Sequence, residues 1–555
     1  MKQLIYLLVF LSSGLLAQQT DTVFILATTD VHGCIQPYDY FKDQPADLGL
    51  AKAYTKIADF RRRHKNIILL DAGDLLQGTP LTYLFNHEKN TYLNPMILTL
   101  NYMGYDAFAV GNHDIEQGVF VYEKARAESR FSWLSANSLL EDGRTYFEPY
   151  TILERNDIRI GVIGLTTPGI PMWLDESLYP GITWTDMVST AKKYCDILKP
   201  EVDILIGLFH AGFDSGYSAE KTKALNIPNE NASGLVAAKV PGFDVIFAGH
   251  SHKEVYPDEY DKANNLNLPL KLNAGHRAKH IAIAQIVLRK VNQQYKIINK
   301  RGWLEPAYNA QAAESIIQLT DFFHQQTLEY TRREIAEING VLDTRWSRVE
   351  DTPAIEQINK AQMAASDAQI SFASSFNNKL IIEDSVLKVK DIYSLYPYEN
   401  YLYVINMTGE QIRKYIEYST QYYLKNYNHS GESEYIAGHD PDIAGYNYDM
   451  AEGINYTIRV NRTMESRQDK SVRNKIVNLT LSDGSQLEKE KYYRVAVNSY
   501  RASGGGGFMN AAGIKDPEII WKSNREIRTI LIDYFQKEGV ILQEVDDNWK
   551  VEIED

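Results

Sequence analysis

Cysteine is scarce in this sequence, since Cys34 and Cys195 are the only two among 555 residues. A dense disulfide framework of the kind found in small exported domains is therefore excluded. Cys34 lies in a loop rich in polar side chains, and Cys195 lies in a stretch with helical periodicity. We expect no bridge between them, so the fold must depend on its packed cores.

Long apolar runs are also missing after the first residues of the chain. Lys2 precedes the apolar segment Leu4 to Leu11, and small residues lead to Ala17. This pattern is typical of a secretory signal peptide. It is shorter than the roughly 20 apolar residues that a membrane anchor needs. We expect residues 1–17 to be removed, leaving a secreted or periplasmic protein without a membrane contact.

Positive charge is in deficit: 58 Lys and Arg face 72 Asp and Glu, for a net charge of −14. A broad surface for a nucleic-acid polymer needs the opposite balance. A small anionic substrate stays open, because bound cations reverse the field locally. The chain is too long for one core, so we expect two or three domains.

Short apolar runs alternate with amphipathic stretches between Thr22 and about Arg301, which is typical of an α/β domain. The amphipathic stretches include Leu48 to Arg63 and Trp184 to Leu198. The runs expected to form strands are Val23 to Ala27, Ile67 to Leu70, Ala107 to Val110, Ile158 to Leu165, Ile204 to Phe209, Val245 to Ala248 and Ile281 to Leu288.

Helical periodicity over Gln311 to Ile338, with no Gly or Pro until Gly340, predicts a helix that links two domains. We therefore divide the chain into residues 1–17, a first domain at 18–305, a linker helix at 306–340 and a second domain at 341–555. In the second domain we expect helices at Pro353 to Ala365, Thr408 to Tyr422 and Asn524 to Lys537, and strands near Tyr401 to Ile405, Asn455 to Val460 and Tyr493 to Val497.

Five predicted strands of the first domain are followed directly by side chains that bind metals or move protons. One such stretch, Gly111-Asn112-His113-Asp114, is explained equally well on its own as a solvated turn. Ligands of open α/β sheets, however, bind at the carboxyl ends of strands. The other four stretches are Asp30-Val31-His32, Asp71-Ala72-Gly73-Asp74, His210-Ala211-Gly212 and Gly249-His250-Ser251-His252.

Gathered at one edge, these groups would repel one another or stay without partners unless they bind cations. Imidazole with carboxylate favours Zn, Mn, Fe or Co over Ca, which prefers oxygen ligands. Two cations about 3.5–4 Å apart need a bridging carboxylate. We expect Asp74 to bridge, with one late histidine completing each metal. The predicted ligands are Asp30, His32 and Asp74 at one metal, Asp74, Asn112 and His210 at the other, and His250 and His252.

In this order the five motifs resemble those of the calcineurin-like metallophosphoesterases. The later stretches Tyr396-Pro397-Tyr398-Glu399-Asn400, Thr408-Gly409 and Asn498-Ser499-Tyr500-Arg501-Ala502, with Gly504 to Gly507, resemble the C-terminal domain of secreted 5′-nucleotidases and of 2′,3′-cyclic-nucleotide 2′-phosphodiesterase/3′-nucleotidases. The resemblance implies a four-layer α/β/β/α catalytic domain, a C-terminal α/β nucleotide-binding domain, and two-metal hydrolysis of a small nucleotide. We expect a monomer.

The resemblance places aromatic rings at Tyr398 and Tyr500 to hold a nucleobase, and each stacked base gains about 1–3 kcal/mol. The alternative is that these are two of 37 tyrosines that simply pack. Gly504 and Gly505 have no side chains, so their backbone amides could approach the substrate closely. A flexible loop is the alternative for the two glycines.

The expected catalytic residues are Asn112, His113 and Glu116. Asn112 would ligate a metal and donate to a phosphate oxygen. His113 is too close to Asn112 in sequence to reach the same metal comfortably, so we expect it to protonate the leaving oxygen or stabilise the phosphorus. Either Glu116 or Asp114 would orient His113. Many 5′-nucleotidases have an aspartate at the position of Glu116, so the longer side chain is a departure.

A second departure concerns the substrate. Typical 5′-nucleotidases carry Gly-x-Arg before the aromatic loop, whereas the matching stretch here, Ser371 to Leu380, has no arginine. Asn447-Tyr448-Asp449-Met450 and Gly453-Ile454-Asn455-Tyr456 look more like the cyclic-nucleotide branch. We expect hydrolysis of 2′,3′-cyclic nucleotides and 3′-nucleotides. The alternatives are a 5′-nucleotidase or UDP-sugar hydrolase, and a non-catalytic nucleoside-binding protein.

Overall fold

The computed structural model describes residues 20–213, 229–257, 266–425, 438–467, 469 and 472–553. The predicted signal peptide lies outside these ranges. Among the described residues, no helix has both the length and the apolar character needed to cross a bilayer. Cys34 and Cys195 are buried and unbridged, which confirms that prediction.

Two six-stranded sheets form the N-terminal domain. The first has the order β16-β15-β1-β4-β5-β6, with bounds Gln294–Pro306, His280–Val291, Thr20–Thr28, Ile67–Asp71, Ala107–Ala109 and Ser132–Leu134. The second has the order β13-β14-β12-β11-β9-β8, with bounds Glu254–Val255, Leu270–Ala274, Val245–Ala248, Ile204–His210, Ile158–Thr166 and Tyr150–Arg155. All seven strands expected in this domain are present.

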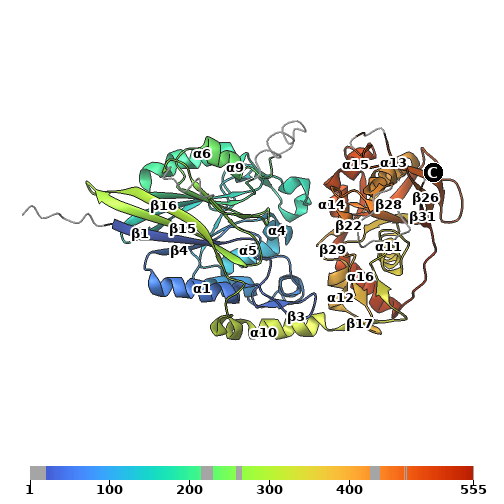
Figure 1. Ribbon diagram of the computed structural model, residues 1–555, viewed down its shortest axis with the longest axis horizontal. Helices are drawn as coiled ribbons and strands as arrows, with labels where there is room; N and C mark the ends of the chain where they lie inside the picture. Colours follow the sequence, from blue (N-terminus) through green and yellow to red (C-terminus); the bar gives the residue numbers. More distant parts are fainter. Residues whose placement is uncertain are drawn as a thin grey trace, which may run out of the picture.

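The two sheets pack face to face, and helices cover both outer faces. Apolar side chains from both sheets, such as Ile25 and Val162, form one buried core between them. Helices α1 (Leu50–Arg63), α3 (Pro95–Met103) and α5 (Val119–Glu128) cover the first sheet, and α6 (Met187–Leu198) and α9 (Ser233–Lys239) cover the second. Figure 1 shows this domain at the left. The predicted four-layer α/β/β/α architecture is confirmed.

The linking segment is only partly helical. Helix α10 spans Glu314–Thr331, and β17 then follows at Glu334–Ile338. The prediction of one helix to residue 338 was therefore wrong at its end. Ile335 and Ile338 stand three residues apart, which suits a helix, but both become buried when β17 pairs with β21 (Val386–Lys388) and β30 (Val540–Ile541). Long-range pairing outweighs the local periodicity.

The C-terminal domain is built on a five-stranded sheet of order β25-β19-β28-β22-β29. Its strands are Asp449–Glu452, Ile370–Ser374, Tyr492–Asn498, Tyr401–Thr408 and Ile519–Glu526. A smaller sheet contains β27 (Lys475–Leu481), β26 (Ile454–Val460) and β31 (Trp549–Ile553). The expected helices correspond to α11 (Pro353–Ser366), α13 (Gly409–Ser419) and α16 (Ile527–Glu538). The last begins three residues later than predicted, because residues 524–526 complete β29.

Strand direction positions the site. Strands β1, β4 and β5 run parallel to one another, and so do β9, β11 and β12 in the other sheet. Their carboxyl ends therefore lie at one edge of each sheet. The short helix α4 (Asn112–Glu116) begins at this edge, on the side of the domain that faces the C-terminal domain (Figure 1).

Candidate metal centre and substrate pocket

The structure brings all seven predicted metal ligands together at the strand ends. Six of them fall into two groups in which one ligand atom per residue lies within 4.8 Å of the others. The first group is Asp30, His32, Asp74 and His252, and the second is Asp74, His210 and His250. Asp74 belongs to both groups, which is the position that a bridging carboxylate requires.

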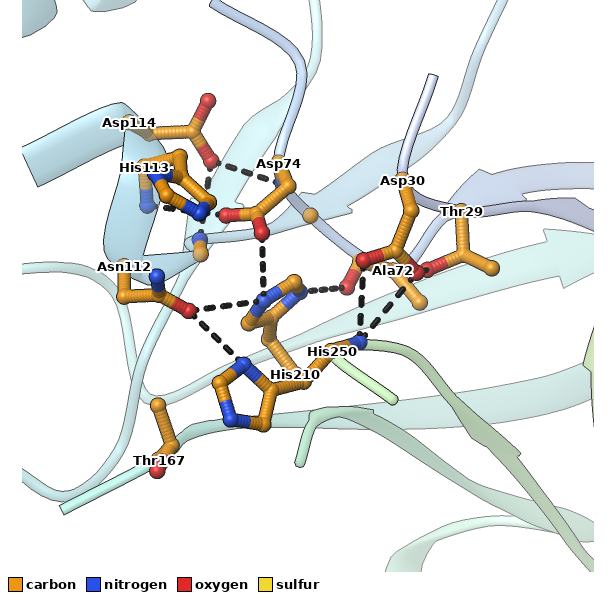
Figure 2. A network of polar contacts seen from close by, with 12 residues as sticks. Thr29, Asp30, Ala72, Asp74, Asn112, His113, Asp114, Thr167, His210 and His250 are labelled. Carbon is orange, nitrogen blue, oxygen red and sulfur yellow. Dashed lines mark hydrogen bonds and ion pairs between the residues drawn. The ribbon is translucent and has the colours of Figure 1, made fainter. Parts of the chain in front are cut away.

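The second group closes around Asn112, as Figure 2 shows. The Asn112 carboxamide oxygen lies 2.9 Å from His250 Nδ1 and 3.2 Å from His210 Nε2. His210 Nε2 is also 3.0 Å from a carboxylate oxygen of Asp74. Four ligand atoms from the carboxyl ends of four strands, β4, β5, β11 and β12, thus converge on one point.

The first group is equally compact. The Nε2 atoms of His32 and His252 are 2.9 Å apart, and His252 Nε2 is 3.3 Å from an Asp30 oxygen. Two imidazole nitrogens at this distance are unfavourable neighbours if both are protonated. A shared cation between them and the carboxylates removes the conflict.

Backbone carbonyls fix which nitrogen of two histidines is free to bind a cation. His210 Nδ1 lies 2.7 Å from the Ala72 oxygen, and His32 Nδ1 lies 3.1 Å from the Gln77 oxygen. Each Nδ1–H therefore donates to a carbonyl and leaves the Nε2 lone pair facing the cluster. Such a second hydrogen bond is usual for histidines that ligate metals, because it sets the ring orientation.

The electrostatics of the polypeptide also suit a cation. Burial lowers the pKa of His32 to about 4 and that of His250 to about 3, so both rings are neutral near pH 7. Burial alone would lower the pKa of His210 as well, but the Asp74 carboxylate beside it raises that pKa to about 9. The site thus stabilises positive charge at its centre. Neutral imidazoles with carboxylates fit a first-row divalent cation.

Backbone strain is concentrated in the same loops. Non-glycine residues rarely adopt positive φ, and holding them there costs free energy. Five of the seven predicted ligands do so, with φ between 49° and 69°: Asp30, His32, Asp74, His250 and His252. Such strain is typical of functional sites, where surrounding contacts fix the side chains.

Glycines allow the loops to approach this closely. A Cβ atom at Gly73, whose φ is +101°, would lie 2.5 Å from His210 Nδ1. A Cβ atom at Gly111 would lie 2.1 Å from an Asp74 oxygen. Both contacts are far inside van der Waals distance, so a larger residue at either position would displace a predicted ligand.

The structure separates the two candidate partners of His113. Glu116 reaches His113, with 2.5 Å between a carboxylate oxygen and Nδ1. Asp114 instead accepts backbone N–H bonds from Asp74, Leu75, Leu76 and Gly111 at 2.8–3.0 Å. Its carboxylate therefore holds the loop of the bridging residue. Burial alone would lower the pKa of His113, but Asp74 and Glu116 raise it to about 10.

A cavity of about 380 Å³ lies between the two domains. Asn112, His113 and His250 line it from the N-terminal domain. Tyr398 and Tyr500 line it from the C-terminal domain, and their side chains are 46% and 39% exposed. These rings are therefore available for stacking rather than committed to a core.

Sequence reasoning missed three further aromatic residues at this cavity, Phe376, Tyr446 and Trp173. Tyr446 stands edge-on to Tyr398, with ring centroids 6.4 Å apart. Trp173 stacks on His250 at 5.5 Å and lines the metal side. Tyr446 directly precedes the Asn447 stretch used for the family comparison, so that stretch gave a signal for it. Nothing in the sequence around Trp173 distinguishes it.

A buried ion pair supports the aromatic loops. Arg501 makes two contacts with Asp449, at 2.9 and 3.0 Å, and both side chains are 3% exposed. Arg501 also donates to the carbonyl oxygens of Tyr446 at 2.7 Å and Gly505 at 3.3 Å. One guanidinium thus ties together the loops that carry Tyr446 and Tyr500.

The structure places the glycine loop differently from expectation. Neither Gly504 nor Gly505 is among the residues that line the cavity. A Cβ atom at Gly505 would lie 2.5 Å from the Tyr500 ring. Gly505 therefore provides the space in which this ring sits, and the expected approach of its amide to substrate has no support in the geometry.

The fold and the site define a two-domain phosphoesterase. Residues 25–254 match the calcineurin-like phosphoesterase family, and residues 334–513 match the 5′-nucleotidase C-terminal domain. The chain therefore belongs to the nucleotidases that join a calcineurin-like phosphoesterase domain to this C-terminal domain. Members of the first family use divalent metal ions. The two residue groups described above have the carboxylate and imidazole ligands that such ions need.

Individual relatives agree with this assignment. The chain is 26% identical to the trifunctional nucleotide phosphoesterase protein YfkN of Bacillus subtilis, over 95% of the chain but only 38% of that protein. It is 27% identical to a 2′,3′-cyclic-nucleotide 2′-phosphodiesterase/3′-nucleotidase of Haemophilus influenzae, over 95% of the chain and 87% of the relative. A 5′-nucleotidase of Vibrio cholerae is 25% identical over 89% and 86%.

A solved structure from Staphylococcus aureus shows the same two-domain fold. Its TM-score is 0.75, and the match covers 96% of this chain and 100% of that one. The identity is 22%, so this likeness concerns the fold alone.

Proposed function

We propose that this protein hydrolyses 2′,3′-cyclic nucleotides and 3′-nucleotides at two divalent cations. The observation that carries the proposal is the shared cavity, which has Asn112 and His250 on one side and the exposed rings of Tyr398 and Tyr500 on the other. A nucleotide has the same two ends, a phosphoester and a flat base. The cavity, at about 380 Å³, has the size of a small-molecule site.

The residues divide the reaction between them. Two bound cations would activate water and withdraw charge from the phosphoryl oxygens. The seven predicted ligands would hold these cations, with Asp74 common to both. Asn112 Nδ2 is free to donate to a phosphate oxygen, since its Oδ1 faces the two histidines. Tyr398 and Tyr500 hold the base and orient the ester.

His113 is the proposed acid. Its ring lines the cavity, while Glu116 contacts Nδ1 and leaves Nε2 to face the substrate. Protonated His113 would give its proton to the leaving sugar oxygen. A 2′,3′-cyclic substrate opened in this way yields a 3′-monophosphate, which the same site then hydrolyses.

Two observations favour cyclic and 3′-nucleotides over 5′-nucleotides. No arginine occurs in Ser371 to Leu380, where typical 5′-nucleotidases carry one. The Haemophilus relative with the cyclic-nucleotide name is 27% identical over 95% of the chain. The 5′-nucleotidase of Vibrio cholerae supports the second candidate, a 5′-nucleotidase or UDP-sugar hydrolase with the same metal centre.

Phosphate release from 3′-AMP, 5′-AMP and 2′,3′-cAMP tests the choice. The purified protein would be assayed with Mn²⁺ or Zn²⁺, with phosphatase added to the cyclic reaction so that every product is counted. We expect the highest kcat/KM for 2′,3′-cAMP and 3′-AMP. A clear preference for 5′-AMP would establish the second candidate instead.

We propose further that the protein acts outside the cytoplasm. The support is the signal-peptide pattern of residues 1–17, in which Lys2 precedes an apolar segment that ends in small residues. Expression of the full chain, followed by cell fractionation and N-terminal sequencing, tests this. A mature N-terminus near Gln18 in the extracytoplasmic fraction is the expected result.

A further inference from the structure

Glu399 is a buried carboxylate at the boundary between the two domains. It directly follows Tyr398 in the loop that presents the base-stacking ring, and only 7% of it is exposed. It nevertheless borders the substrate cavity. The proposed reaction gives it no role.

The carboxylate of Glu399 has one partner in each domain. One oxygen accepts a hydrogen bond from Gln117 Nε2 at 3.2 Å, across a sequence separation of 282 residues. The other oxygen lies 2.7 Å from a guanidinium nitrogen of Arg528. Arg528 also contacts Glu526 at 3.0 Å, and it is 2% exposed.

Gln117 belongs to the catalytic side. It caps the carboxyl end of helix α4, directly after Glu116, and this helix carries Asn112 and His113. Asn86 Nδ2 donates to the Gln117 oxygen at 3.1 Å and also to the Leu76 carbonyl at 2.7 Å, in the loop after Asp74. The Gln117 amide is therefore fixed, with its nitrogen turned toward Glu399.

Stability alone is a weak explanation for this arrangement. Two carboxylates share one arginine in a buried place, and such groups lose hydration that apolar side chains would not lose. A purely structural contact could be made by packed hydrophobic residues. The hydrogen bond between Gln117 and Glu399 instead joins the base-binding loop to the carboxyl end of the helix that carries the proposed acid.

We propose that Glu399 is a positioning residue that, through Gln117, holds the base-binding loop in register with the His113–Glu116 pair. Base stacking at Tyr398 then places the ester at the metals. The inference rests on the proposed function, because it requires a substrate with a base. A misplacement of about 1 Å can cost about 100-fold in rate, so a single hydrogen bond suffices for such an effect.

Two variants and two substrates test the proposal. Gln117→Met removes the hydrogen bond at similar volume, and Glu399→Gln removes the charge at the same shape. The substrates are 3′-AMP and glycerol 2-phosphate, which are both phosphate esters of secondary alcohols, but only the first has a base. We expect kcat for 3′-AMP to fall about 10-fold or more in each variant, with KM nearly unchanged. The rate with glycerol 2-phosphate should stay within about 2-fold.

The double variant and a matched control complete the design. If both residues act through one contact, the double variant should lose no more than the worse single variant. Asp175→Asn is the control, because Asp175 pairs with Lys522 across the same domain boundary at a more exposed place. It should change neither substrate's rate. Unfolding temperature and bound metal should match the wild type in all variants.

Each contrary result has its own meaning. An equal fall on both substrates would show that Gln117 merely supports helix α4, and would overturn the proposal. The proposal would also be overturned if the losses of the two single variants added up in the double variant, or if the rate with 3′-AMP did not change. A wild-type protein that cleaves glycerol 2-phosphate but no nucleotide would overturn the proposed function itself, and the positioning role with it.

Discussion

The two sides of the substrate cavity are built differently. The metal wall, defined here as the seven predicted ligands, includes side chains such as Asp30, Asp74 and His210 that are at most 1% exposed. The aromatic wall, defined as Phe376, Tyr398, Tyr446 and Tyr500, includes three tyrosines that are 39–46% exposed. The first is fixed by strained loops and buried contacts, and the second is supported from behind by Arg501 and Asp449.

This difference indicates how each wall contributes. Groups that stabilise developing charge must be in place before the reaction, because reorganising them costs free energy in the transition state. A base needs only a flat apolar surface, and exposed rings supply it with little sequence preference. Changes in the metal wall should therefore affect every phosphoester, whereas changes in the aromatic wall should affect only substrates with a base.

The largest effect is expected for Asp74→Asn. The neutral carboxamide keeps the shape but removes the negative charge shared by both groups. We expect kcat to fall by at least about 10³-fold on both 3′-AMP and glycerol 2-phosphate. Metal analysis of the purified variant should show less bound metal. The exposed Asp142→Asn serves as control, and a variant that keeps full activity would exclude Asp74 as the bridge.

The second largest effect is expected for His113→Ala, and comparison with His250→Ala separates a loss of catalysis from a loss of bound metal. His113→Ala should lower kcat by about 10²–10⁴-fold while the metal content stays near that of the wild type. His250→Ala should lower both, because His250 faces Asn112 within the second group. Equal metal loss in the two variants would remove His113 from its role as the acid.

The metal wall was also the part most accessible from sequence. Parallel strands end at one edge, so five polar stretches after five apolar runs had to meet there. The pairing of His113 with Glu116 rather than Asp114 was open, since both stand within one turn of α4. In the structure the Asp114 carboxylate accepts hydrogen bonds from four backbone N–H groups, so Glu116 is the residue that pairs with His113.

The aromatic wall was less predictable for a physical reason. Tyr398 and Tyr500 came only from resemblance, because a stacking tyrosine has no spacing rule that separates it from a packing one. The contacts of Glu399 with Gln117 and of Arg501 with Asp449 join residues far apart in the chain. Similarly, β17 looked helical because its partner strands lie elsewhere in the sequence.

A smaller effect is expected when the stacking rings are removed. Tyr398→Ala and Tyr500→Ala should each lower kcat/KM for 3′-AMP about 5–150-fold, equivalent to about 1–3 kcal/mol per ring. Both a higher KM and a lower kcat should contribute, because each ring binds the base and also orients the ester. Glycerol 2-phosphate should be cleaved at the wild-type rate. Tyr492→Ala is the control, because Tyr492 is 62% exposed at the opposite end of β28. Loss of activity on both substrates would contradict the view that the aromatic wall acts only on substrates with a base.

The smallest effect is expected for Tyr446→Leu. Tyr446 meets Tyr398 edge-on at 6.4 Å, while Phe376 meets the same ring edge-on at 5.0 Å from another loop. Leucine keeps an apolar contact but loses the edge-to-face interaction, which is worth about 0.5–1.5 kcal/mol. KM for 3′-AMP should therefore rise about 2–12-fold. The Arg501 contact uses the Tyr446 carbonyl, which leucine retains, so the unfolding temperature should hold. A KM increase as large as that of Tyr398→Ala would mean that Tyr446 itself stacks on the base.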